Sequence, residues 1–193
     1  MKFQRRIAVA TAIAALLSAS SWVAAQTSGE KEEFDAVAMV NNNIASGAGR
    51  VQIQITRWST GGERTKLVDT LLQKGPDDLL KELRKTRPVG IIKTPDSLGY
   101  DLHYAQQTPD AEGGRTIVLA TDRPISFWEA ANQPRTIDYP FTIIEMHIGR
   151  DGTGTGTLSY ATKVTARGQN IELENFASAP VMLTQIEAKK RTS

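Results

Sequence analysis

The sequence predicts a mostly β fold of the α+β class, in which an antiparallel meander of about nine strands forms a barrel or a sandwich and a helical hairpin packs on it. Two observations support this prediction. After residue 88 the chain consists of short apolar stretches separated by turn-forming residues, which is typical of consecutive antiparallel strands. Only the region of about 61–87 shows helical periodicity, so the helices are expected there.

Two strands are expected before this helical region. Residues 34–40 (FDAVAMV) form an apolar stretch, and a turn-prone segment rich in Asn, Ser and Gly follows over residues 41–49. Val51, Ile53 and Ile55 then alternate with polar residues. Alternation with a period of two predicts a strand with one buried face.

Two adjoining helices are expected over residues 61–87. Thr60 and Glu63 have the spacing of a capping box, in which the side chain of each accepts a hydrogen bond from the backbone of the other. Gly75 ends the first helix and Pro76 begins the second, because a proline at the first helical position lacks only an N–H group that has no helical partner. Pro88 prevents continuation. The apolar faces consist of Leu67, Val68, Leu71 and Leu72 in the first helix and of Leu79, Leu80 and Leu83 in the second.

The rest of the chain is expected to consist largely of strands. Asp151-Gly152 indicates a tight hairpin turn. Residues 125–131 (ISFWEAA) are expected to form a helical turn or a short helix. The predicted strands cover residues 89–93, 99–106, 115–120, 142–149, 158–166, 171–174 and 180–186.

The glycines of residues 152–157 (GTGTGT) resemble a phosphate-binding loop only superficially. The run lacks the Lys-Ser/Thr pair that follows such a loop, and it does not connect a strand to a helix. We expect Gly154 and Gly156 to leave one strand face bare, so that a large side chain or a ligand lies against the backbone.

The start of the chain has the pattern of a cleaved export signal. Lys2, Arg5 and Arg6 provide a positive start, residues 7–17 are uncharged, and Val23-Ala24-Ala25 provides small residues for cleavage before Gln26. The apolar run is shorter than the roughly 20 residues of a membrane-spanning helix. We therefore expect a soluble periplasmic or extracellular protein with no transmembrane segment in the mature chain. The expected parts are the signal (1–25), a flexible leader (26–33), one β-rich domain (34–188) and a tail (189–193).

Composition narrows the expected partners. The 193 residues include 23 Lys+Arg and 21 Asp+Glu, and loss of the three basic signal residues changes the formal net charge from +2 to −1. Nucleic acid is not an expected partner, because its binding requires a surplus of cations. The chain has no cysteine, which excludes disulfides, thiolate metal sites and Cys nucleophiles. No motif indicates a cofactor.

Each histidine has a carboxylate two residues before it. These pairs are Asp101 with His103 and Glu145 with His147. Residues i and i+2 of a strand point to the same face, so neighbouring strands would combine the two pairs into a site for zinc or another divalent ion. The alternative is that both pairs are polar residues on solvent-exposed strand faces.

Residues 121–141 (TDRPISFWEAANQPRTIDYPF) combine prolines, aromatic residues and charges in one connection. Long irregular connections with aromatic residues and arginines often carry the binding residues of β scaffolds. The alternative is a plug at one end of a barrel, with Arg123–Asp122 or Arg135–Asp138 as structural ion pairs. The candidate ligand-binding residues are Trp58, Arg123, Trp128, Arg135 and Tyr139.

The same region carries a family resemblance. Its segments are LGYDL (98–102), ATDRPI (120–125), FWEA (127–130), NQPR (132–135) and DYPFT (138–142). The chain resembles a group of uncharacterised exported bacterial proteins from about residue 49 to the last strand. The resemblance implies a bacterial envelope or secreted context, and it implies no activity, ligand or site residue.

Together these patterns favour an exported, non-enzymatic binding domain for a small amphipathic ligand or an envelope partner. Two other classes stay open, namely a metal-dependent enzyme that uses Asp101, His103, Glu145 and His147, and a purely structural envelope protein. The positions of the two histidines test the enzyme hypothesis. A barrel interior filled with side chains would favour the structural hypothesis.

Overall fold

Ten strands and two helices form in the residues that the computed structural model describes. These residues are 30–41, 46–94, 97–123, 125, 139–168, 170–175 and 179–190. The predicted signal and most of the helix predicted at 125–131 lie outside them. The strands are β1 (Glu32–Asn41), β2 (Ser46–Ile55), β3 (Gly90–Lys93), β4 (Tyr100–Leu102), β5 (Tyr104–Pro109), β6 (Arg115–Thr121), β7 (Phe141–Ile148), β8 (Thr153–Arg167), β9 (Asn170–Asn175) and β10 (Val181–Lys190), and the helices are α1 (Gly61–Lys74) and α2 (Pro76–Lys85).

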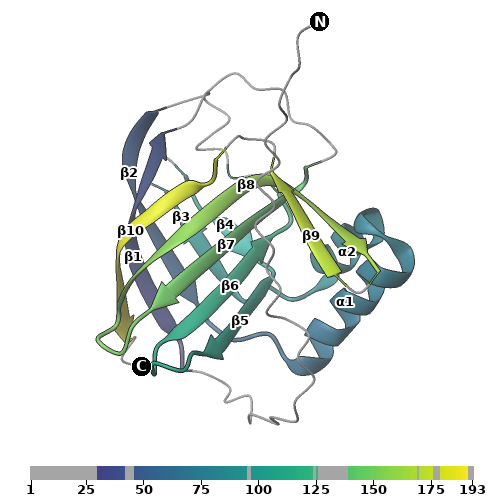
Figure 1. The fold of residues 1–193 in the computed structure, drawn as a ribbon, viewed down its shortest axis with the longest axis horizontal. Coiled ribbons are helices and arrows are strands. Elements are labelled where there is room, and N and C mark those ends of the chain that lie inside the picture. Colours follow the sequence, from purple (N-terminus) through teal and green to yellow (C-terminus); the bar gives the residue numbers. More distant parts are fainter. Residues whose placement is uncertain are drawn as a thin grey trace, which may run out of the picture.

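The strands form one antiparallel sheet that curls into a nearly closed barrel (Figure 1). Hydrogen-bonded neighbours follow the order β4-β3-β2-β1-β10-β8-β7-β6-β5, and β9 pairs with β8 beside this path. Strands that are consecutive in the sequence are mostly neighbours in the sheet, as in the predicted meander. The structure confirms the predicted fold class and, of the two predicted architectures, forms the barrel.

The barrel closes at a seam where the chain passes from one edge of the sheet to the other. The edge strands β4 and β5 are separated in the sequence only by His103. On one side of the seam the Val89 amide donates to the Leu102 carbonyl at 2.7 Å, and on the other the His103 amide donates to the Ala120 carbonyl at 2.9 Å. One continuous segment therefore forms both edges of the sheet, and it bonds to the chain beside β3 on one side and to β6 on the other.

Side chains fill the interior of the barrel. Inward positions alternate with outward ones along the strands, as the period of two predicts for Val51, Ile53 and Ile55. Trp58, which follows β2, packs in the same core cluster. The largest fully buried side chains of this cluster are Phe34, Ile53, Ile55, Ile92, Leu102, Ile117, Leu119, Ile125, Ile144, Met146 and Leu158.

A partly buried ion pair lies beside this core, between β1 and β6. The Arg115 guanidinium donates to both carboxylate oxygens of Glu32, to Oε1 at 2.8 Å, and to the Gln107 side chain. It also lies 6.0 Å from the centre of the Phe34 ring. Four side chains from three strands thereby share one set of polar and cation–π contacts.

We expect Glu32→Ala to lower the free energy of unfolding by about 2–3 kcal/mol, because Arg115 would lose its counter-ion in a largely buried place. The value is below that of a fully buried pair because about a quarter of the Arg115 side chain is exposed. Urea unfolding measures it, with Asp78→Ala as the control, since Asp78 pairs with Lys81 on an exposed helix surface. Equal stability of the Glu32→Ala variant and the parent would contradict the importance of this pair.

The helical hairpin packs on the outer face of the barrel and forms a second core. Leu67 and Leu71 of α1 and Leu79 and Leu83 of α2 contact Ala120, Phe141 and Val164 of β6, β7 and β8. The capping box of Thr60 and Glu63 is present, and Gly75, at a φ of 87°, separates the helices as predicted. The buried face of α1 is narrower than predicted, because Val68 is only half-buried and Leu72 is 40% exposed.

Several strand boundaries differ from the predicted ones. β1 begins at Glu32, inside the predicted leader, and β10 reaches Lys190, inside the predicted tail. Lys189 forms an ion pair with Asp35 of the neighbouring β1, so strand pairing orders a segment that has no local strand signal. β8 begins at Thr153 rather than at residue 158, because cross-strand hydrogen bonds make up for the weak strand preference of its glycines.

The glycines of β8 leave one strand face bare, as predicted, and β7 lies against it. A Cβ atom at Gly154 would lie 2.1 Å from the His147 carbonyl oxygen, and one at Gly156 would lie 2.3 Å from that of Glu145. The backbone of β7 therefore approaches both glycines, and the Ile148 side chain also lies against Gly154. The predicted hairpin turn is confirmed, with Gly152 at a φ of 81° and its amide bonded to the Gly149 carbonyl at 3.0 Å.

Candidate functional site

A cluster of charged side chains lies at the barrel seam. Asp122, directly after β6, is buried, and its carboxylate accepts hydrogen bonds from two arginines. Arg84 of α2 donates from Nε to Oδ2 at 3.2 Å, and Arg123 donates from Nε to Oδ1 at 3.4 Å. The two arginine side chains are 54% and 61% exposed. The cluster therefore joins the helical hairpin to the barrel and exposes cationic groups beside the seam.

The sequence around β6 and β7 fixes the position of this cluster. The Arg123 carbonyl accepts hydrogen bonds from the hydroxyl groups of Thr121 and Thr142, at the end of β6 and the start of β7. Both threonines are fully buried. These two hydrogen bonds hold Arg123, at the start of the connection between β6 and β7, against the end of β6 and the start of β7.

His103 is buried at the seam and attaches it to the end of α2. Its Nδ1 lies 2.9 Å from the Thr86 carbonyl oxygen, so Nδ1 carries a proton and donates, because a carbonyl only accepts. Its Nε2 lies 3.7 Å from Asp122 Oδ1, beyond hydrogen-bond distance. Thr86 is the C-terminal cap residue of α2, and the imidazole thus satisfies a carbonyl at a helix end.

The two predicted metal pairs do not come together. His103 bonds to Ala120, whereas His147 pairs with Thr116, so four residues of β6, about 14 Å, separate their positions. His147 Nε2 lies 3.1 Å from Glu145 Oε1 on the barrel exterior. Asp101 is exposed whereas His103 is buried, because the chain crosses the seam at His103. Among the described residues no group of three or more His, Cys, Asp and Glu is arranged to hold a metal ion.

The predicted ligand-binding residues have different surroundings. Trp58 is part of the barrel core, where its Nε1 has no hydrogen-bond partner within the described part of the chain. Arg123 lies at the seam, and the Asp122–Arg123 ion pair predicted for the plug alternative is present. Tyr139 donates from its hydroxyl to Glu174 of β9 at 2.7 Å. Trp128 and Arg135 lie outside the described residues, as does the predicted partner of Arg135.

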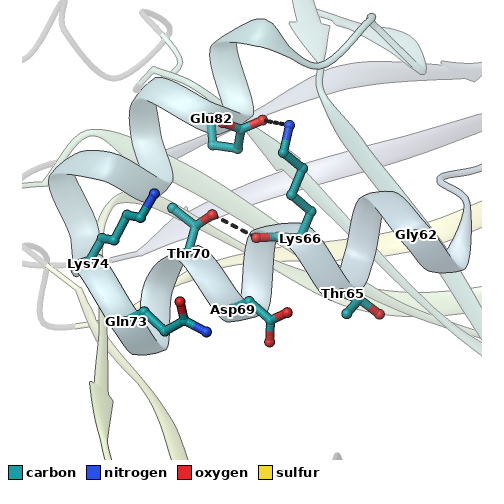
Figure 2. Close-up of a pocket in the computed structure, with 8 residues that line it drawn as sticks. All are labelled: Gly62, Thr65, Lys66, Asp69, Thr70, Gln73, Lys74 and Glu82. Carbon is teal, nitrogen blue, oxygen red and sulfur yellow. Dashed lines mark hydrogen bonds and ion pairs between the residues drawn. The ribbon is translucent and has the colours of Figure 1, made fainter.

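Two open hollows lie along the helical hairpin, where the sequence patterns indicated no site. The larger is about 500 Å³ in volume, and Figure 2 shows Lys66 of α1 reaching across it to Glu82 of α2. The second is about 260 Å³ and lies between the start of α1 and the end of α2. It is lined by Glu63, Lys66, Leu67, Glu82, Lys85, Thr86 and Arg87. The signal for it in the sequence is the number of cations near these two helix ends.

Glu63 connects the second hollow to Arg57, which lies between β2 and α1. Its carboxylate accepts two hydrogen bonds from Arg57, both at 3.0 Å, and one from the Thr60 amide at 2.8 Å. The Arg57 hydrogen bonds in particular hold the pKa of Glu63 below its ordinary value of 4.5. The stability that this ionised carboxylate contributes is present above the ordinary pKa and is lost as the pH falls through the lower pKa of the folded state.

We therefore expect Glu63→Gln to be less stable than the parent at pH 7, because glutamine lacks the charge that attracts Arg57. The difference should shrink as the pH falls below the ordinary pKa of 4.5 and through the lower pKa of the folded state, where the parent carboxylate becomes protonated. Urea unfolding at pH 7, 5 and 3 measures this, with Glu112→Gln on the exposed turn before β6 as the control. A difference that does not change with pH would contradict the role of the ion pair.

The chain matches no protein family, no curated protein and no solved structure. The resemblance to exported bacterial proteins therefore stays a prediction from the quoted segments. Neither helix of the described part has the length and apolar character that crossing a membrane would require.

Proposed function

We propose that this chain is an exported binding domain whose partner is another macromolecule of the cell envelope, bound on the outside of the barrel. The observation that supports this most strongly is the filled interior, where Phe34, Ile53 and Leu119 are fully buried among other apolar side chains. A small barrel either fills its interior with side chains or holds one small ligand there. Since side chains occupy this interior, the binding contacts are assigned to the outer surface.

The ribbon of β8 and β9 offers an apolar face for such contacts. Val164 pairs with Leu173, and Ala166 pairs with Ile171, so these four residues share the face of the ribbon that packs against the helices through Val164. Leu173 and Ile171 are nevertheless more than a third exposed, as is Leu72 of α1. Ile171 and Leu173 are neighbours on one face of β9, and adjoining exposed apolar side chains are typical of protein interaction surfaces.

A small amphipathic ligand beside the seam is the second candidate. The exposed guanidinium of Arg123 favours it, because an arginine at the start of an aromatic-rich connection can hold a carboxylate. A metal-dependent enzyme is not proposed, because the structure separates the Asp101–His103 and Glu145–His147 pairs.

Site-specific photo-crosslinking in the native host tests the proposed surface. A photoreactive residue at Leu173 or Leu72 should form an adduct with one larger partner. The same residue at Met39, which is exposed on β1, is the matched control and should not form that adduct. Equal labelling at all three positions, or none at any of them, would contradict a specific partner on this face and favour a purely structural protein.

The proposed export of the chain can be tested separately from its binding. The positive start, the apolar run and Val23-Ala24-Ala25 indicate cleavage before Gln26. N-terminal sequencing of the exported protein should therefore begin with Gln-Thr-Ser. Intact Met1 on membrane-bound material would show that the segment is an anchor or is not a signal.

A further inference from the structure

The second hollow of the helical hairpin has an unusual balance of charge. Two of its lining residues, Glu63 and Glu82, are acids, and Lys66, Lys85 and Arg87 are cations. Arg57 adds a fourth cation through its bonds to Glu63. The net charge that the hollow offers to a ligand depends on whether Glu63 and Glu82 are already neutralised by cations.

Both carboxylates of the hollow are already paired. Arg57 binds Glu63 through two parallel hydrogen bonds, the strongest arrangement of this ion pair. Lys66 reaches across from α1 to Glu82 on α2 (Figure 2). The Lys66 hydrogen bond is also the main reason why the pKa of Glu82 lies below its ordinary value. Each acid is thus ionised and neutralised at neutral pH.

Lys85 and Arg87 are left in surplus on the same hollow. The Lys85 ammonium lies 3.9 Å from Glu82 Oε2, a carboxylate that Lys66 already holds. The Arg87 side chain forms no ion pair with any residue of the described chain, and it is exposed. The neighbouring Arg84 and Arg123 also share a single carboxylate, that of Asp122. Positive charge is therefore concentrated at this end of the hairpin.

We propose that this hollow binds a phosphate group, either free or on a lipid headgroup. Lys85 supplies a compact ammonium with three donors, and Arg87 supplies a fork that binds two oxygen atoms at once. Thr86 lies between them and lines the same hollow. This inference names the chemistry of a partner and so rests on the proposed function for its biological meaning, although phosphate affinity can be measured without it.

Calorimetric titration of the exported chain with inorganic phosphate is the first test. The parent should bind phosphate saturably, and the Lys85→Gln/Arg87→Gln variant should bind at least tenfold more weakly. The matched control is Lys74→Gln/Lys81→Gln, which removes two cations of the same hairpin that do not line this hollow and should keep the parent affinity. Thermal melting of each variant verifies that the fold is intact.

Sedimentation with vesicles distinguishes the two sources of phosphate. Binding to phosphatidylglycerol vesicles but not to phosphatidylcholine vesicles, lost in the Lys85→Gln/Arg87→Gln variant, would assign the site to lipid headgroups. Phosphate binding without vesicle binding would assign it to free phosphate. No saturable binding in either experiment, or equal weakening in both variants, would overturn the proposal. Failure of the crosslinking at Leu173 would instead overturn the proposed partner surface and leave the phosphate affinity unchanged.

Discussion

Phe34→Ala is expected to lower the free energy of unfolding by about 3–5 kcal/mol. Phe34 is fully buried inside the barrel and lies beneath the Arg115 guanidinium, so its truncation leaves a cavity and removes the apolar support of the ion pair. The cost combines the lost burial of the ring with the empty space that neighbouring strands cannot fill. Urea unfolding followed by circular dichroism measures it.

Met39→Ala is the matched control for this prediction. Met39 lies on the same strand but points outward and is 49% exposed, so its truncation should change stability by no more than about 0.5 kcal/mol. If the two variants unfolded at the same urea concentration, Phe34 would not belong to a packed interior. The assignment of binding to the outside of the barrel would then lose its main support.

Leu71→Ala is expected to cost about 2–5 kcal/mol, because Leu71 lies between α1 and the outer face of the barrel. It contributes to the second core together with Phe141 and Val164. The adjacent Leu72→Ala is the control, since Leu72 is exposed and should lose much less. A melting temperature of Leu71→Ala equal to that of the parent would mean that the hairpin does not depend on this face.

Local signals predicted the elements whose residues determine their own structure. Thr60, Glu63, Gly75 and Pro76 act within one or two helical turns, so the helical hairpin was predictable in detail. The alternation of Val51, Ile53 and Ile55 likewise indicated a buried strand face. Gly152 was predictable as a hairpin turn because its positive φ suits glycine and little else.

Contacts between distant residues account for what the sequence patterns missed. Glu32 and Arg115 are 83 residues apart, and Arg84 and Asp122 are 38 residues apart, so no local pattern pairs them. His103 illustrates the same limit at short range. Its spacing from Asp101 indicated a shared strand face, but the chain changes sheet edges at His103, and its Nε2 lies 3.7 Å from the carboxylate of Asp122.

The candidate site was predictable only in part for the same reason. Arg123 and Asp122 are adjacent, so their ion pair was foreseeable as a structural contact. The hollow at Lys85 and Arg87 forms only when the start of α1 meets the end of α2. Its charge also depends on which acids have partners, and Glu82 is paired from the other helix through Lys66. The sequence shows these cations, but it does not show that the acids beside them are already paired with other cations.

Native mass spectrometry of the chain purified from its own host tests most directly whether the barrel interior is filled and binding takes place outside it. The expected spectrum of the folded protein has the mass of residues 26–193, with no small molecule retained in the barrel. A small molecule retained in a one-to-one ratio, and released only when the barrel unfolds, would contradict the proposed function. It would show that the barrel opens to hold a ligand among the side chains around Phe34.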